Sequence, residues 1–307
     1  MMSFLIARIA QMGVVLFGIL TLLFFLLRLT GDPLSMLAAP DTPPQQLDHL
    51  RHSMGLDQPP VQQYVIFLRH SLVLDFGNSI QYGQPALPLV LARLPATIEL
   101  TVAAFILAIV VGLPLGVIAA IERRRTVSML VGMAAGLGQS MPLFWLGLLL
   151  ILLFGVRLQL LPTFGIGGPD HLILPALTLG APTLAKTMRL IRSSMLEVLG
   201  QDYVRTAKAK GLSRRVVIVR HALRNALIPT VTALGVDFGL LLGGAVLVEQ
   251  VFAWPGMGRQ LTQAVLGRDY PLIEATVFVI GTLILVINLA VDLSYRYLDP
   301  RIRLEVS

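Results

Sequence analysis

Charged side chains offer the clearest chemistry in this chain, and they concentrate in one stretch, Lys186 to Arg224. This stretch contains ten Lys and Arg residues but only two acids, Glu197 and Asp202. It can contact anionic lipid, and in a membrane protein it fixes the topology, because cytoplasmic loops collect Lys and Arg. The basic residues are Lys186, Arg189, Arg192, Arg205, Lys208, Lys210, Arg214, Arg215, Arg220 and Arg224.

The same stretch contains signals for two short helices. Asp202 can cap the first helix, and Gly211 can end it, with a positive φ. Ser213 can cap a second helix that runs on toward Asn225. Two short helices that meet at a glycine on a membrane surface form a shape suited to docking against a partner.

Acidic residues inside apolar runs are the other candidates, because ionisable groups within a membrane are costly and usually functional. Asp237 lies about a third of the way into an apolar run near 227–250, and Glu249 lies at the outer end of that run. Asp237 either lines a wet pathway or pairs with a partner such as Asn288. Glu249 and Asp292 lie close to the predicted membrane surfaces, where they can be solvated or paired. Asp237, Glu249 and Asn288 are the candidates for a pathway across the membrane.

Catalytic and metal-binding chemistry has little support in the sequence. The chain has no cysteine, which excludes disulfides, zinc–cysteine sites and thiol nucleophiles. Its histidines are scattered, without the spacing of metal ligands. The chain has no G-x-x-x-x-G-K-[ST] motif, so any nucleotide-driven step would use an ATPase on another polypeptide. The histidines are His49, His52, His70, His171 and His221.

The elements that must position these residues are apolar helices. Hydrophobic residues make up 55% of the 307 residues and charged residues 13%, which predicts an integral membrane protein. A bilayer core about 30 Å thick needs about 20 apolar residues in a helix, and six runs qualify. The third run is interrupted by Gln139–Pro142, which predicts a kink, and the fourth, which holds Pro175 and Pro182, is the weakest. The runs lie near 9–27, 98–121, 127–154, 172–192, 227–250 and 274–294.

Basic residues set the predicted orientation. With the N-terminus inside, seventeen Lys and Arg fall on the cytoplasmic side and seven outside. Both termini are therefore predicted to be cytoplasmic, and residues 9–27 form an uncleaved span. Residues 29–94 form the largest outside segment. Within it we expect a helix with one apolar face that packs on the protein or at the lipid interface. That face consists of Val61, Tyr64, Val65, Leu68 and Leu72.

Glycines are frequent in the fifth apolar run. Gly239 and Gly243 have the G-x-x-x-G spacing that allows helices to approach closely. This spacing is compatible with ordinary packing within one chain and with an interface to a second subunit.

Longer stretches of the chain resemble a known family. Residues 202–213 (DYVRTAKAKGLS) and 220–229 (RHALRNALIP) resemble the cytoplasmic coupling loop of binding-protein-dependent ABC importer permeases, of the peptide and nickel group. The segment after the first span is similar to the B-type subunit of dipeptide/oligopeptide permeases. Residues 205–207 (RTA) stand where the general family pattern has Glu-Ala-Ala, so no particular ion pair with an ATPase is carried over. Supporting matches are 28–33 (RLTGDP), 75–79 (DFGNS), 94–97 (LPAT), 243–249 (GGAVLVE), 252–258 (FAWPGMG), 268–271 (RDYP) and 299–303 (DPRIR).

The resemblance implies an all-α type I ABC importer permease fold with six transmembrane helices, in a bacterial inner membrane. The chain itself would bind no cofactor, because two separate ABC ATPase subunits would bind ATP and Mg²⁺. The other implied partners are a homologous second permease, an extracytoplasmic substrate-binding protein and membrane lipid, with no nucleic acid.

The resemblance also implies an organisation and a set of coupling residues. The regions are a first transmembrane helix (1–28), an extracytoplasmic domain (29–94), a five-helix core (95–294) with a coupling loop (193–226), and a cytoplasmic tail (295–307). The implied ATPase-coupling residues are Asp202, Tyr203, Arg205, Thr206, Ala207, Lys208, Ala209, Lys210 and Gly211.

The implied function is ATP-driven import of di- or oligopeptides through a pathway shared with the second permease. An ion-coupled secondary transporter or channel acting alone is the alternative. Asp237 is its best support, but it predicts more buried charge and inverted repeats. A membrane-tethered nucleic-acid binder is a third interpretation, since the basic helix–glycine–helix superficially resembles a helix-turn-helix. Its short connections to apolar runs leave little freedom to enter a groove.

Overall fold

The computed structural model describes residues 2–29, 57–122 and 125–298. These residues form helices joined by loops, and the only β-pairing among them is an isolated bridge between Asn78 and Pro85. The predicted all-α class is therefore confirmed. The chain divides into two compact units, residues 1–96 with 255–289 and residues 97–254 with 290–307.

The first unit is organised around two long antiparallel helices, α1 and α13. Tyr270 Oη, at the start of α13, donates to the carbonyl oxygen of Leu27 at 2.8 Å. Eleven residues further along α13, Gly281 faces Leu16 of α1. The helices of this unit are α1 (Met2–Leu29), α4 (Pro60–Leu72), the start of α5 (Ala86–Ile121), α12 (Met257–Leu266) and most of α13 (Tyr270–Leu298).

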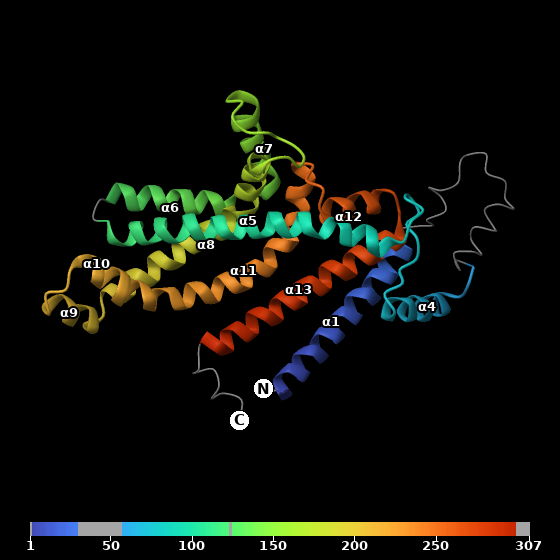
Figure 1. Cartoon of the computed structure of the whole chain (residues 1–307), viewed down its shortest axis with the longest axis horizontal. Coiled ribbons are helices and arrows are strands. Elements are labelled where there is room, and N and C mark those ends of the chain that lie inside the picture. Colours follow the sequence, from blue (N-terminus) through green and yellow to red (C-terminus); the bar gives the residue numbers. More distant parts are fainter. Residues whose placement is uncertain (1, 30–56, 123–124, 299–307) are drawn as a thin grey trace. The chain divides into compact units, whose positions relative to one another are not determined.

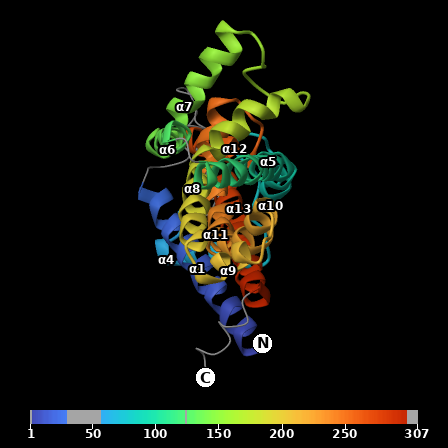
Figure 2. The same ribbon diagram turned by 90° about the vertical axis from the view of Figure 1, so that its left-hand side faces the viewer.

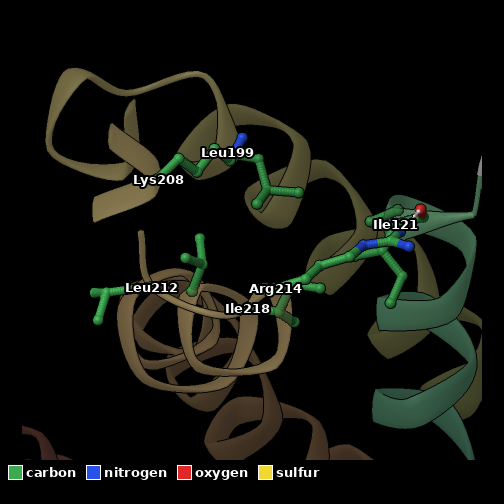
Figure 3. Close-up of a pocket in the computed structure, with 8 residues that line it drawn as sticks. Ile121, Leu199, Lys208, Leu212, Arg214 and Ile218 are labelled. Carbon is green, nitrogen blue, oxygen red and sulfur yellow. Dashed lines mark hydrogen bonds between the residues drawn. The ribbon is translucent and has the colours of Figure 1, made fainter. Parts of the chain in front are cut away.

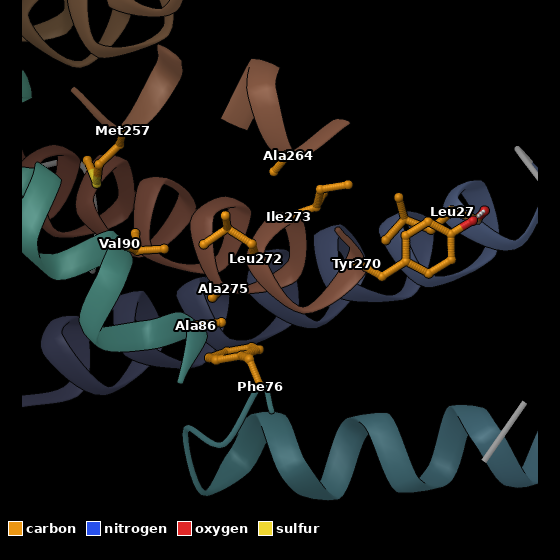
Figure 4. Close-up of a cluster of buried hydrophobic side chains, with 10 residues drawn as sticks. All are labelled: Leu27, Phe76, Ala86, Val90, Met257, Ala264, Tyr270, Leu272, Ile273 and Ala275. Carbon is orange, nitrogen blue, oxygen red and sulfur yellow. Dashed lines mark hydrogen bonds between the residues drawn. The ribbon is translucent and has the colours of Figure 1, made fainter. Parts of the chain in front are cut away.

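A cluster of buried apolar side chains joins these helices. It brings together α1, the start of α5, α12 and α13, with Phe76 entering from the loop before α5 (Figure 4). Burial of such side chains is the main favourable term that holds the loop segments onto the helices. The cluster consists of Leu27, Phe76, Ala86, Val90, Met257, Ala264, Tyr270, Leu272, Ile273 and Ala275.

Helix α4 packs through its aromatic residues. The ring of Phe24 in α1 lies 5.1 Å from that of Tyr64 and 5.4 Å from that of Phe67, measured between centroids. Phe67 is buried against α1 by these contacts, since aromatic pairs favour close, offset or edge-on geometry. The predicted apolar face is therefore packed at Tyr64. Val61 and Leu72 are exposed within this unit, so packing at the lipid interface stays a prediction for them.

The second unit is built around α8. This helix packs against α5, α6 and α11, and α8 and α11 lie side by side in both views (Figures 1 and 2). Its elements after α5 are α6 (Arg125–Ser140), α7 (Leu143–Leu150), η1 (Ile151–Arg157), α8 (Pro169–Leu199), α9 (Asp202–Ala209), α10 (Arg214–Val216), η2 (Val217–Leu223) and α11 (Arg224–Val251), in which η1 and η2 are π-helical.

Glycines allow α5 and α8 to pack with their backbones close together. A Cβ atom on Gly116 would lie 2.6 Å from the carbonyl oxygen of Met188, and one on Gly180 would lie 2.7 Å from that of Ala104. Gly112 and Gly116 thus form the G-x-x-x-G face that packs within this unit. The G-x-x-x-G spacing singled out in the fifth run does not mark such a contact at Gly243, because a Cβ there would meet nothing within 4 Å.

Four helices in the described part of the chain are long and apolar enough to cross a membrane: Leu5–Leu29, Ala86–Ile121, Arg214–Val251 and Tyr270–Ser294. They correspond to the first, second, fifth and sixth predicted runs. The third run is broken at Pro142, between α6 and α7, where a kink was predicted. The fourth forms the long helix α8, which keeps both interior prolines. The count of six spans and the sides of the termini stay predictions, and residues 30–56 and 299–307 lie outside the described residues.

Candidate functional site

Helix α9 lies on the rest of the second unit through two small apolar side chains. Val204 and Ala207 are buried and form a cluster with Val217 of η2, against which Val198 and Leu199 of α8 also pack. Ala207, one of the predicted coupling residues, therefore faces inward. The other predicted coupling residues of α9 and the turn after it are exposed: Asp202, Tyr203, Arg205, Thr206, Lys208, Ala209, Lys210 and Gly211.

Gly211 turns the chain after α9, and its φ of +78° confirms the prediction of a positive value. Side chains strain the backbone in this region, whereas glycine adopts it freely. The backbone N–H of Gly211 donates to the carbonyl oxygen of Lys208 at 3.0 Å. Two residues later Ser213 starts a run of helix, Arg214–Val251, that continues through η2 into α11 without a break.

The predicted capping interactions are not present. Gln201, not Asp202, occupies the N-cap position of α9, and Asp202 is the first helical residue. Ser213 does occupy the N-cap of the second helix, but neither cap donates or accepts a side-chain hydrogen bond. Asp202 still favours the helix, because a carboxylate in the first turn interacts well with the helix dipole.

The start of the second helix is fastened to α5. Arg214 Nη2 donates to the carbonyl oxygen of Ile121, the last residue of α5, at 2.9 Å. A cation there satisfies an unpaired carbonyl and complements the negative end of the helix dipole. Figure 3 shows Arg214 extended toward Ile121 along a pocket of about 440 Å³. A second link joins Asn225 Nδ2 to the hydroxyl oxygen of Tyr203 at 2.8 Å.

Asp237 is paired with a lysine from the neighbouring helix. Lys186 Nζ of α8 donates to Asp237 Oδ1 of α11 at 2.6 Å. The Asp237 side chain is 7% exposed and that of Lys186 is 37% exposed, so one edge of the pair is open. The pair offsets the cost of placing a carboxylate in a membrane span. The structure thus gives Lys186 as the partner, whereas the sequence suggested Asn288, which is exposed on α13 in the first unit.

Glu249 is fully buried, and the prediction that it can be solvated is wrong. Thr97 Oγ1 of α5 donates to Glu249 Oε1 at 2.7 Å. A buried carboxylate requires such donors. The alternative prediction, a paired Glu249, is therefore confirmed, and the hydrogen bond links the α11 and α5 segments of this unit.

Sequence reasoning assigned Lys186 and Arg214 only to the basic segment and missed their structural roles. The role of Lys186 could have been predicted, because a lysine inside a weak span requires an acidic partner in another span, and Asp237 was already a candidate. The role of Arg214 could not have been predicted, since its acceptor is a backbone carbonyl distant in sequence. Among the described residues, no group of three or more His, Asp or Glu side chains could hold a metal ion.

These features describe a chain whose long apolar helices could cross a membrane and to which an exposed basic helix is fixed. The sequence profile of the family described as the binding-protein-dependent transport system inner membrane component matches residues 112–304, and the profile of that family's N-terminal part matches residues 1–101. The chain belongs to this family of ABC importer permeases.

The sequences of known relatives align with nearly the whole chain. The glutathione transport system permease protein GsiC of Escherichia coli K12 is 41% identical over 304 residues, which cover 99% of each chain. GsiC of Shigella flexneri serotype 5b is 40% identical over the same length.

Solved structures support the fold. The MetNI methionine ABC transporter in an inward-facing conformation matches with a TM-score of 0.58 and 20% identity, covering 69% of this chain and 96% of the other. An amino acid ABC transporter matches with a TM-score of 0.55 and 17% identity, covering 68% and 94%. The type I importer permease fold expected from the sequence is thus confirmed.

Proposed function

We propose that this chain is one of two permease subunits of an ATP-driven importer for short peptides in a bacterial inner membrane. Its partners are a homologous permease, two separate ATPase subunits that bind ATP and Mg²⁺, and an extracytoplasmic substrate-binding protein. One observation carries the proposal: α9 is fixed on a helical run that continues, from Arg214 to Val251, into an apolar span.

The coupling step follows from this arrangement. The inner residues Val204 and Ala207 hold α9 to η2, which leaves its outer face for a groove of an ATPase subunit. Arg205, Lys208 and Lys210 surround that face with solvated charge, which favours orientation and association rate more than affinity. Closure of the ATPases would push α9, and η2 and α11 would carry the movement into the membrane.

The pathway is proposed to lie along the helices that contain the Lys186–Asp237 pair. A hydrated edge on this pair would suit a polar solute, whereas contact with lipid chains would be costly. A second permease would complete the wall of a peptide-sized path around these helices.

Short peptides are the proposed substrates because the GsiC relatives carry glutathione in their names and glutathione is a tripeptide. This assignment is also the finer part of the sequence-based resemblance to dipeptide and oligopeptide permeases. Selectivity is expected to rest mostly on the separate substrate-binding protein.

The test is reconstitution of the complete complex in liposomes. Peptide uptake should require ATP and the binding protein, and peptide-loaded binding protein should raise ATP hydrolysis. Uptake by the purified chain alone, without ATP, would instead favour the secondary transporter, for which Asp237 was the best support.

A further inference from the structure

The first unit contains a polar pocket that the proposed coupling and pathway do not use. It has a volume of about 220 Å³ and lies between the segment before α5, the start of α5 and the first turns of α12. None of the described residues that line it is acidic. They include Tyr82, Arg93, Gly256, Arg259, Gln260 and Gln263.

Two arginines bring positive charge to the pocket. Arg93 and Arg259 both line it, and a guanidinium group has the planar fork that matches the two oxygens of a carboxylate. Helix α12 begins there, at Met257, and its N-cap Gly256 provides no side-chain acceptor. The positive end of the helix dipole adds to the attraction for an anion.

Gln260 adds a buried acceptor that requires a hydrogen-bond donor. This residue is 6% exposed, and its Nε2 donates to the carbonyl oxygen of Leu89 at 3.4 Å. Its buried Oε1 has no donor within the described part of the chain. A buried acceptor without a donor is unfavourable, and an N–H group of a ligand would offset this cost after a small rotation of the amide.

We propose that this pocket binds the carboxylate end of an amino acid or short peptide. Arg93 and Arg259 hold the carboxylate, and Gln260 accepts a hydrogen bond from the N–H group beside it. The volume has room for a terminal residue rather than a whole peptide. The identity of the ligand as a transported peptide rests on the proposed function, but the existence of the site does not.

The chain lacks cysteine, so a single introduced thiol reports on this pocket alone within the chain. Gln263→Cys places it at an exposed position of the lining. In the purified complex without ATP, an anionic methanethiosulfonate should label it at least threefold faster than a cationic one. Glycylglycine should slow labelling saturably by fivefold or more, whereas glycinamide, which has no carboxylate, should not.

Variants of the arginines make the test specific. Arg93→Gln and Arg259→Gln should each remove the preference for the anionic reagent and the protection by glycylglycine. Arg93→Lys should keep the preference but lose most of the protection, because lysine cannot form the bidentate contact. Arg69→Gln, an exposed arginine of α4 that does not line the pocket, should change neither.

Three results would overturn the proposal. These are equal labelling by both reagents in the parent variant, equal protection by glycinamide, and protection by the binding protein without any peptide. The last would show that the binding protein itself covers the pocket. Labelling needs neither transport nor hydrolysis, so failure here is distinct from failure of the proposed importer function.

Discussion

At the scale of single residues, Gly211 forms the turn that follows α9, the helix proposed to dock on the ATPases. Valine at φ +78° costs about 1 kcal/mol or more in backbone strain. We expect Gly211→Val to insert normally but to release the ATPase subunits or to uncouple hydrolysis from transport. Co-purification of the ATPases and peptide-stimulated hydrolysis in vesicles measure the two effects.

Gly165→Val is the matched control. Gly165 lies in the same unit, has the same φ of +78° and also has open space around it, but it is outside the coupling segment. If both variants behave alike, general strain explains the result. Wild-type coupling in Gly211→Val would mean that Gly211 is only a loop glycine.

The Lys186–Asp237 pair makes a second prediction at this scale. Removing either partner leaves one charge unpaired, so Asp237→Leu and Lys186→Met should each lower thermal stability and transport. The double variant should recover most of the stability, because neither charge of the pair is left without its partner.

Measuring the transport rate of the double variant distinguishes a structural role of the Lys186–Asp237 pair from a functional one. We expect the double variant, although stable, to transport at least tenfold more slowly than the wild type. Recovery of both stability and transport would reduce the pair to a packing feature.

At the scale of elements, the contact between Arg214 and the end of α5 should restrain the coupling segment. Arg214→Gln should speed amide hydrogen exchange of residues 202–213 several-fold, because local opening becomes easier. Arg215→Gln removes the same charge one residue later, where the structure records no such contact with α5, and should leave exchange unchanged. Identical exchange in both variants would show that the hydrogen bond to Ile121 contributes nothing to the restraint.

The glycine face between α5 and α8 is the second feature at this scale. Gly116→Leu forces a side chain into the backbone of Met188 and should destabilise the chain by about 1–3 kcal/mol or more. Gly136→Leu in α6 is the control, since a Cβ there meets nothing within 4 Å. Thermal unfolding in detergent compares them, and equal midpoints would contradict the close packing.

Local features of the elements could be predicted from the sequence, and contacts between elements could not. The turn at Gly211 and the break near Pro142 depend on the backbone of one or two residues, so residue type alone predicts them. The inward position of Ala207 depends on Val217, and the burial of Glu249 depends on Thr97, 152 positions away. The position of Lys186 inside a span signalled an acidic partner, but choosing between Lys186 and Asn288 for Asp237 needed the relative rotation of the helices, which composition does not specify.

At the scale of the whole molecule, the distribution of basic residues predicts that both termini are cytoplasmic. Single-cysteine variants test this directly because the natural chain has none. In intact spheroplasts, Ser3→Cys, Ser213→Cys and Ser307→Cys should resist a membrane-impermeant maleimide. Gln58→Cys should react, and all four should react after lysis. Labelling of Ser213→Cys from outside would overturn both the orientation and the coupling role of α9.

The helical run from Arg214 to Val251 has 38 residues. At about 1.5 Å per residue it is about 57 Å long, whereas a bilayer core of about 30 Å holds only about 20 residues. Under the proposed coupling role, the remaining length would act as a lever arm of about 27 Å, and a tilt of about 10° where it enters the bilayer would move its α9 end by about 5 Å. A thicker membrane would cover more of the arm and shorten it. The movement required of the ATPases would then depend on the thickness of the lipid bilayer around this subunit.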